Sequence, residues 1–186
     1  MAFISEPRRP NLVLRLGTWI AERITGRRME PARVLGWYPR AAVSSGVMES
    51  LVAHGEPSER ILKLVRIAAS ETTTCPFCID MNSAAYDTVG LTDAEVDALL
   101  AGAQVPTLTP RERVAVEYAR AISATPLRFP SALIDELTQR FSEREVVILA
   151  TTAAQVNYWA RTIQALGVPP AGFGSARPPR GGTAAG

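Results

Sequence analysis

The chain has 186 residues, 47% of them hydrophobic and 20% charged, which suits one globular domain with a full hydrophobic core. Lys and Arg number 20 against 18 Asp and Glu, so the composition does not favour a nucleic-acid-binding protein, which would present a basic face with interleaved aromatic side chains. The longest apolar stretches are broken by charges well short of the roughly 18 residues that span a bilayer, and two cysteines are too few for a secreted protein held by several disulfides.

The N-terminal part of the chain predicts a leader and two helices. Residues 1–10, MAFISEPRRP, lack the basic-then-apolar order of a signal peptide, so we expect a cytoplasmic protein. The next segment, NLVLRLGTWIAERI, has a broad apolar stripe and ends at Gly26, which predicts an amphipathic helix. Packing on its own domain or on a partner subunit explains this helix better than a membrane surface does. A proline-punctuated link then leads to a helix over 41–53, ended by Gly55.

Helix starts are clearly signalled from Ser58 onward. Ser58 precedes a nearly continuous apolar pattern, which predicts a central, buried helix. Capping boxes, in which Ser or Thr is followed three residues later by Glu, mark further starts at Thr92, Thr109 and Ser142. With one shorter helix, the elements expected from here on cover residues 93–101, 110–124, 131–140 and 143–166.

These elements predict an all-α fold, because alternating patterns typical of strands are scarce. We expect a single compact domain over residues 11–167, with about seven to eight helices and no internal repeat. Residues 168–186 are too rich in Pro, Gly and small residues to bury a core, so a flexible tail is expected there.

Two cysteines three residues apart, Cys75 and Cys78, are the most informative feature of the sequence. The threonines at 72–74 are good helix caps and Pro76 fits a first helical turn, so a helix is predicted to begin close to Cys75 and to end near Gly90. Unpaired backbone N–H groups and the helix dipole lower a thiol pKa in such a turn. The spacing places both sulfurs on one face, where they can exchange between dithiol and disulfide.

Other uses of two cysteines fit the sequence less well. A c-type haem would need a histidine directly after the second cysteine, where Ile79 stands. A zinc site would need about two more ligands, and His54 is the only histidine. A thioredoxin-like site expects strands, and a disulfide across so short a loop stabilises little. Two small core residues remain an alternative, although Pro76 between them is hard to explain by packing. We therefore expect no metal and no organic cofactor.

One segment, from Val47 to Leu100, combines three motifs: ILKLVRIAAS, CPFCIDMNSAA and a short helix after GLTDAE. In these motifs the chain resembles the carboxymuconolactone decarboxylase superfamily, in its AhpD-like alkylhydroperoxidase branch. The resemblance implies an all-helical homo-oligomer that reduces hydroperoxides: one cysteine becomes a sulfenic acid, the other resolves it as a disulfide, and an external dithiol restores both. It implies further that Cys78 reacts with the peroxide and Cys75 resolves, whereas the helix-end argument favours both thiols and Cys75 more.

Two positions depart from the pattern of that family. A histidine four residues after the second cysteine is replaced by Asn82, which can form hydrogen bonds but cannot shuttle a proton near neutral pH. A glutamate twelve residues before the first cysteine is replaced by Lys63, which could stabilise a thiolate but cannot take its proton as a carboxylate would. Glu59 and Glu71 are carboxylates that could substitute, although such residues are more often solvated surface charges.

Three further places could take part in the site. His54, at the end of its helix, is the sole histidine, and a histidine there commonly complements the helix dipole. Asp80 and Tyr86 are expected on the same helix as the thiols, where Tyr86 could line a pocket or simply pack. Residues 157–159, Asn-Tyr-Trp, resemble the closing segment of the family and could cover a neighbouring site or pack in an interface.

The sequence thus favours a thiol-dependent peroxidase or related dithiol oxidoreductase that uses Cys75 and Cys78. Its expected partners are a hydroperoxide or another small molecule, an external dithiol and further copies of the chain, with neither nucleic acid nor membrane. Two alternatives remain: a redox-responsive binding protein on the same scaffold, favoured by Asn82 and Lys63, and a lyase like the decarboxylase branch, against which the paired cysteines argue.

Overall fold

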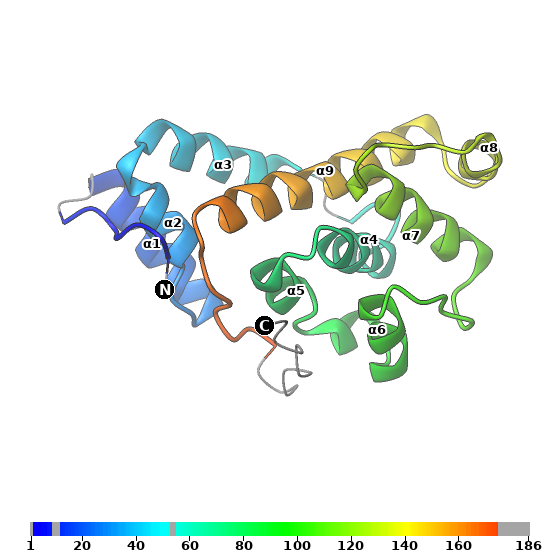
Figure 1. The fold of residues 1–186 in the computed structure, drawn as a ribbon, viewed down its shortest axis with the longest axis horizontal. Coiled ribbons are helices and arrows are strands. Elements are labelled where there is room, and N and C mark those ends of the chain that lie inside the picture. The colour runs from blue at the N-terminus through cyan, green and yellow to red at the C-terminus, as the bar shows by residue number, and fades with distance from the viewer. Residues whose placement is uncertain (1, 9–11, 53–54, 175–186) are drawn as a thin grey trace, which may run out of the picture.

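The computed structural model describes residues 2–8, 12–52 and 55–174. Within these residues it contains nine α-helices, two short 3₁₀ helices (η1 and η2) and no strand, which confirms the all-α prediction (Figure 1). Their order is α1 (Leu12–Thr25), α2 (Glu30–Val34), η1 (Leu35–Trp37), α3 (Pro39–Leu51), α4 (Glu59–Thr72), α5 (Pro76–Asn82), η2 (Tyr86–Val89), α6 (Asp93–Leu100), α7 (Pro110–Ser123), α8 (Ser131–Arg140) and α9 (Glu143–Ala165).

The helix starts lie where the capping residues predict them. The Ser58 side chain accepts the backbone N–H of Ile61 at 3.2 Å, which caps α4. At Thr92, Thr109 and Ser142 both halves of the capping box form, so that α6, α7 and α9 begin one residue later. Local hydrogen bonds therefore mark where these four helices begin.

Two expectations about element boundaries were wrong. The proline-punctuated link contains α2 and η1, because Pro31 occupies the first turn of a helix, where its missing N–H costs nothing. The thiol-bearing helix α5 ends at Asn82, well before Gly90. There the Lys63 ammonium donates to the carbonyl of Ala84, which a continuing helix would have used for the N–H four residues on, and Ala85 turns left-handed with φ +49°.

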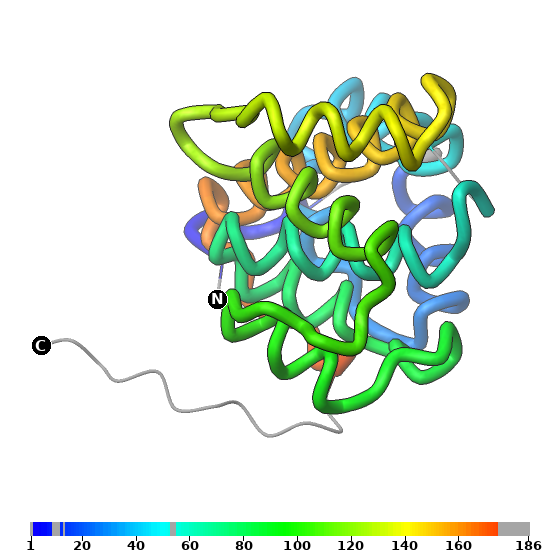
Figure 2. The backbone as a smooth tube through the Cα atoms, turned by 90° about the vertical axis from the view of Figure 1, so that its right-hand side faces the viewer, coloured from blue at the N-terminus to red at the C-terminus, as the bar shows by residue number. Residues whose placement is uncertain are grey.

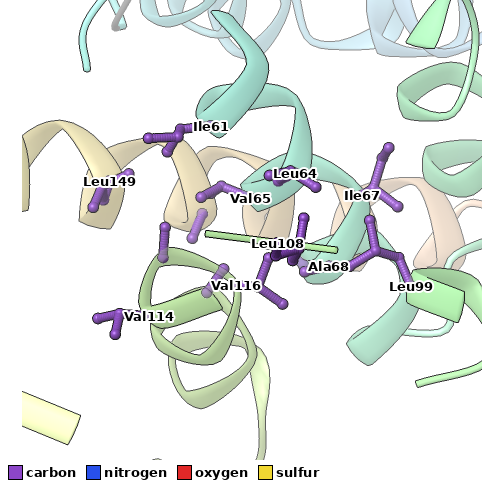
Figure 3. Packing of buried hydrophobic residues seen from close by; sticks show 14 of the residues in the cluster. Ile61, Leu64, Val65, Ile67, Ala68, Leu99, Leu108, Val114, Val116 and Leu149 are labelled. Atoms are coloured by element: carbon purple, nitrogen blue, oxygen red, sulfur yellow. The ribbon is translucent and has the colours of Figure 1, made fainter. Parts of the chain in front are cut away.

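Helix α4 forms the centre of the domain and packs against α5, α6, α7 and α9. Its apolar side chains point into one cluster with residues of the surrounding helices, as Figure 3 shows. The cluster includes Leu64, Val65 and Ala68 from α4, Leu99 from α6, Val114 from α7 and Leu149 from α9. The nearly continuous apolar pattern of α4 is thus explained by contacts on most of its sides.

The two ends of the described chain meet beside α5. Helices α1 to α3 gather at one end of the molecule and α8 at the other, with α9 running between them (Figure 1). Figure 2 looks along this direction from the α8 side. The backbone N–H of Phe3 donates to the carbonyl of Leu166 at 2.9 Å. Of the predicted tail 168–186, residues 168–174 pack on the domain, and 175–186 lie outside the described residues. None of the described helices is long and apolar enough to cross a membrane.

Candidate functional site

The two cysteines form a disulfide in the first turn of α5. Their Cα atoms are 5.2 Å apart. Cys75 is the N-cap residue, and its sulfur accepts the backbone N–H of Cys78 at 3.3 Å. This hydrogen bond points a positive dipole at one sulfur of the pair, so a negative charge on Cys75 is stabilised when the disulfide is open.

The turn between α4 and α5 fixes the position of the pair. Helix α4 ends at Thr72, Thr73 follows as its C-cap, and Thr74 adopts the left-handed conformation with φ +50°. The side-chain amide of Gln164 on α9 donates to the carbonyl of Thr73 at 3.1 Å. The threonines therefore end α4, and the N-cap of α5 that they were expected to supply is the sulfur of Cys75 itself.

An apolar shell encloses both sulfurs. Cys75 is 0% exposed and Cys78 is 1% exposed. The shell brings together α5, α9 and both ends of the described chain, through Ala2, Phe77, Met81, Trp159, Ala160, Ile163, Leu166, Val168, Ala171 and Phe173. In this conformation neither a substrate nor a reductant has access to the pair.

Asn82, which stands where the family pattern has a histidine, ties α5 to α4. Its side-chain amide donates to the hydroxyl of Ser70 at 2.9 Å, and that hydroxyl donates to the carbonyl of Arg66 at 2.7 Å. Asn82 is buried in this arrangement. The contact uses the amide as a structural link between two helices.

Lys63 is directed to the end of α5. Its ammonium donates to the carbonyl of Ala84. Burial lowers the pKa of Lys63, the charge of Arg66 lowers it further, and the charge of Asp87 opposes both. The lysine thus stabilises the turn after Asn82, through an observed contact that differs from the thiolate contact considered from the sequence.

The remaining candidates are dispersed. Glu59 is exposed, and Glu71 is half-buried beside Gly102, where its carboxylate accepts the hydroxyl of Thr72 at 3.3 Å. The expectation that Tyr86 shares the helix of the thiols was wrong, because α5 ends at Asn82 and Tyr86 begins η2. Tyr86 packs against the main core and donates to Asp93 at the start of α6. His54 lies outside the described residues.

Helix α9 contributes more to the site than the sequence indicated. Trp159 packs against the thiol shell, and its indole N–H donates to the carboxylate of Glu49 on α3 at 3.0 Å. Tyr158 shares a hydrogen bond of 2.7 Å with Ser45 on α3, whereas Asn157 donates to Ser123 on α7. One of the three residues therefore faces the thiols, and the other two hold α9 to its neighbours.

Sequence reasoning missed the role of Asp80. Its carboxylate accepts four backbone N–H groups, from Ala171, Gly172, Phe173 and Gly174, at 2.7 to 3.0 Å. The signal was present as the Ala-Gly-Phe-Gly sequence, since glycine permits the curled backbone that such a turn requires. It was hidden by the general richness of that region in Pro and Gly.

Metal binding finds no support in the described part of the chain. Nowhere among those residues do three His, Cys, Asp or Glu side chains come together as potential ligands of one ion. What the site offers is a pair of sulfur atoms that can hold or release two electrons in an apolar enclosure. The fold and this pair define an all-helical protein with a CxxC disulfide at a helix start.

Comparison with known proteins places the chain in a family. The model of the carboxymuconolactone decarboxylase family matches residues 41–121. An uncharacterized protein of Escherichia coli, YnjA, is 31% identical over 169 residues, which are 87% of this chain and 90% of that protein. Uncharacterized YdfG of Bacillus subtilis is 27% identical over 121 residues, 64% of this chain and 82% of that protein. The chain belongs to the carboxymuconolactone decarboxylase family.

Solved structures assign the AhpD-like fold. A peroxidase-related protein of Ralstonia eutropha, described as an alkylhydroperoxidase AhpD core, superposes with a TM-score of 0.81 at 14% identity, over 93% of this chain and 94% of that one. The debrominase Bmp8, in complex with 2,3,4-tribromopyrrole, gives a TM-score of 0.79 at 18% identity, over 95% of this chain and 97% of that one. At these identities the likeness concerns the fold.

Proposed function

We propose that the protein is a thiol-dependent peroxidase that reduces organic hydroperoxides through its two cysteines. The observation that carries the proposal is the disulfide between Cys75 and Cys78, with the backbone N–H of Cys78 directed at the sulfur of Cys75. The apolar shell around the sulfurs suits a neutral organic substrate better than a charged one.

The pair can perform the reaction without a histidine relay. The thiolate of Cys78 attacks the peroxide, the O–O bond breaks, and Cys78 becomes a sulfenic acid while an alkoxide leaves. The thiol of Cys75 gives its proton to that alkoxide, and the hydrogen bond from the Cys78 N–H stabilises the resulting Cys75 thiolate. This thiolate then attacks the sulfenic sulfur, which forms the disulfide and releases hydroxide.

Turnover requires two electrons from outside the chain. An external dithiol attacks the disulfide, forms a mixed disulfide and leaves as its own disulfide, which restores both cysteines. We propose that this cycle runs in the cytoplasm, in a homo-oligomer of the chain, without metal or organic cofactor.

The test follows hydroperoxide consumption by fully reduced protein with a regenerating dithiol. We expect multiple turnovers of cumene hydroperoxide, together with a disulfide between Cys75 and Cys78 shown by alkylation and mass. Absence of that disulfide after exposure to peroxide contradicts the proposal. A single stoichiometric oxidation without turnover supports the redox-responsive binding protein instead.

Reductive dehalogenation is a second candidate, favoured by the likeness to the debrominase over nearly the full length of both chains. The same two thiols would supply the electrons: one bromine of a bromopyrrole is replaced by hydrogen, the thiols become a disulfide, and HBr leaves. Bromide release from 2,3,4-tribromopyrrole by the reduced protein tests this activity. A rate that exceeds the rate with hydroperoxide would assign the site to dehalogenation.

A further inference from the structure

The described chain ends in a segment that covers the disulfide. After α9 the backbone descends along α5, as the orange stretch in Figure 1 shows. We call residues 168–174 the strap. Val168, Ala171 and Phe173 of the strap belong to the apolar shell of Cys75 and Cys78.

Asp80 holds the strap in place. The residue lies on α5, two positions after Cys78, and its carboxylate accepts the four consecutive N–H groups of residues 171–174. Gly172 has φ +78°, which curls the backbone so that these N–H groups converge as in an anion-binding nest. Hydrogen bonds to a carboxylate are about twice as strong as neutral ones, so one side chain provides most of the polar attachment of the strap.

Phe173 closes the cover. Its ring and the ring of Phe77 form a T-shaped pair, with centroids 6.1 Å apart and planes at 84°. Phe77 is itself 1% exposed and stands between the two cysteines in sequence. The aromatic contact therefore extends the attachment of the strap from Asp80 to one of the two residues between the cysteines.

The strap opens at lower cost than the helices that share the enclosure. Apart from Ala2 of the N-terminal segment, the rest of the enclosure comes from α5 and α9, which are held by backbone hydrogen bonds and by the core. The strap has no helix of its own, and segments with few internal bonds open at lower free energy than core helices do. Because both cysteines are buried, one part of the enclosure must move before any reagent reaches them.

We propose that the strap is a gate over the thiol pair. Asp80 holds the gate shut through its hydrogen bonds, and Phe173 does so through its contact with Phe77. Opening the gate breaks the four hydrogen bonds to Asp80 and lifts Phe173 from Phe77, which exposes the sulfurs to substrate and reductant. Asp80 and Phe173 are positioning residues that control access to the cysteines. The inference rests on the proposed function for its role in turnover, but access itself can be measured without hydroperoxide.

The experiment measures how fast a small phosphine reduces the disulfide in the folded, full-length protein. Samples are quenched at intervals by alkylation, and the two modified thiols are counted by mass. We expect Asp80→Asn and Phe173→Ala each to raise the rate constant at least tenfold. Gly172→Ala, which penalises the left-handed backbone of the strap without altering α5, should raise it about threefold or more.

Matched controls separate the gate from general loosening. Asp135→Asn removes an exposed carboxylate on α8, and Phe129→Ala removes a partly exposed ring that contacts Tyr118; neither should change the rate. Thermal unfolding by circular dichroism shows that each variant is folded. If Asp80→Asn accelerates reduction while Phe173→Ala and Gly172→Ala do not, loosening of α5 is the cause and the gate is refuted.

Failure of the gate and failure of the proposed function give different results. If phosphine reduces the strap variants faster but the protein turns over no hydroperoxide, the gate is supported and the peroxidase function is contradicted. Equal reduction rates in all variants of an active peroxidase overturn the gate and keep the activity. Wild-type reduction as fast as that of the unfolded chain also refutes the gate, because the disulfide would then be unprotected.

Discussion

At the scale of single residues, Cys75 and Cys78 hold different positions in one helical turn. The sulfur of Cys75 accepts a hydrogen bond, and the backbone N–H of Cys78 donates it. This asymmetry suits Cys75 to lose a proton and then to act as the resolving thiolate. The family resemblance implies that Cys78 is the sulfur that meets the peroxide, whereas the same hydrogen bond taken alone would make Cys75 the more readily ionised, attacking thiol.

Trapping of the sulfenic acid tests the assignment. In Cys75→Ser, which cannot form the disulfide, we expect cumene hydroperoxide to generate a sulfenic acid on Cys78 that dimedone captures. Its formation should be at least about tenfold slower than oxidation of the wild type, because the proton donor is lost. Cys78→Ser should yield no adduct. A dimedone adduct on Cys75 in that variant, formed as fast as the wild type is oxidised, would reverse the roles.

At the scale of elements, one buried ion cluster joins three helices. Arg60 on α4 donates to Glu95 on α6 at 2.6 Å and to Glu112 on α7 at 2.7 Å. Burial acts to raise the pKa of Glu95, but hydrogen bonds from Arg60, Thr92 and Thr107 outweigh it and lower the pKa to about 2. Each glutamate also completes a capping box, so the residues that begin α6 and α7 also fasten them to α4.

The lowered pKa of Glu95 makes stability depend on pH. Because the folded pKa lies below the ordinary 4.5, the ionised Glu95 stabilises the fold above that pH, and the contribution disappears as the pH falls towards 2. Glu95→Gln should lower the free energy of unfolding by about 3 kcal/mol at pH 7. Urea titrations from pH 7 to pH 2.5 should show this difference shrinking.

The control for that series is Glu136→Gln on α8. Glu136 forms an exposed ion pair with Arg140, 3.6 Å apart, and exposed pairs contribute about 0.5 kcal/mol or less. The variant should therefore match the wild type at every pH. A pH dependence for Glu95→Gln no larger than for this control would show that the cluster is not responsible.

At the scale of the whole molecule, an apolar stripe on α1 faces outward. Its members recur at helical spacing and are Leu12, Leu16, Trp19, Ile20 and Ile24. Ile24 is 80% exposed. A groove of about 500 Å³ lies beside the stripe and is lined by α1 together with Pro7, Ala32 and Gly36 and by charged side chains that include Glu6 and Arg33. Contiguous exposed apolar surface of this kind marks contact sites of proteins, which supports the proposed homo-oligomer.

Assembly through the stripe can be measured by sedimentation velocity. We expect the wild-type chain to sediment as a multiple of its own mass and Ile24→Glu to shift it towards the monomer, because a charge replaces an apolar contact. Leu127→Glu, at an exposed leucine in the loop before α8, is the matched control and should leave the assembly intact. A monomeric wild type would contradict the oligomer, and an intact Ile24→Glu assembly would remove α1 from its interface.

Much of this protein follows from its sequence by local rules. Ser58, Thr92, Thr109 and Ser142 begin their helices because the capping hydrogen bonds join groups only three residues apart. The pairing of Cys75 with Cys78 follows from spacing within one turn in the same way.

The tertiary structure decided what depends on distant groups. Lys63 holds the turn after α5 through Ala84, Asn82 joins Ser70, and the strap closes over the thiols because Asp80 meets backbone N–H groups more than ninety positions away. Local periodicity contains no information on such contacts.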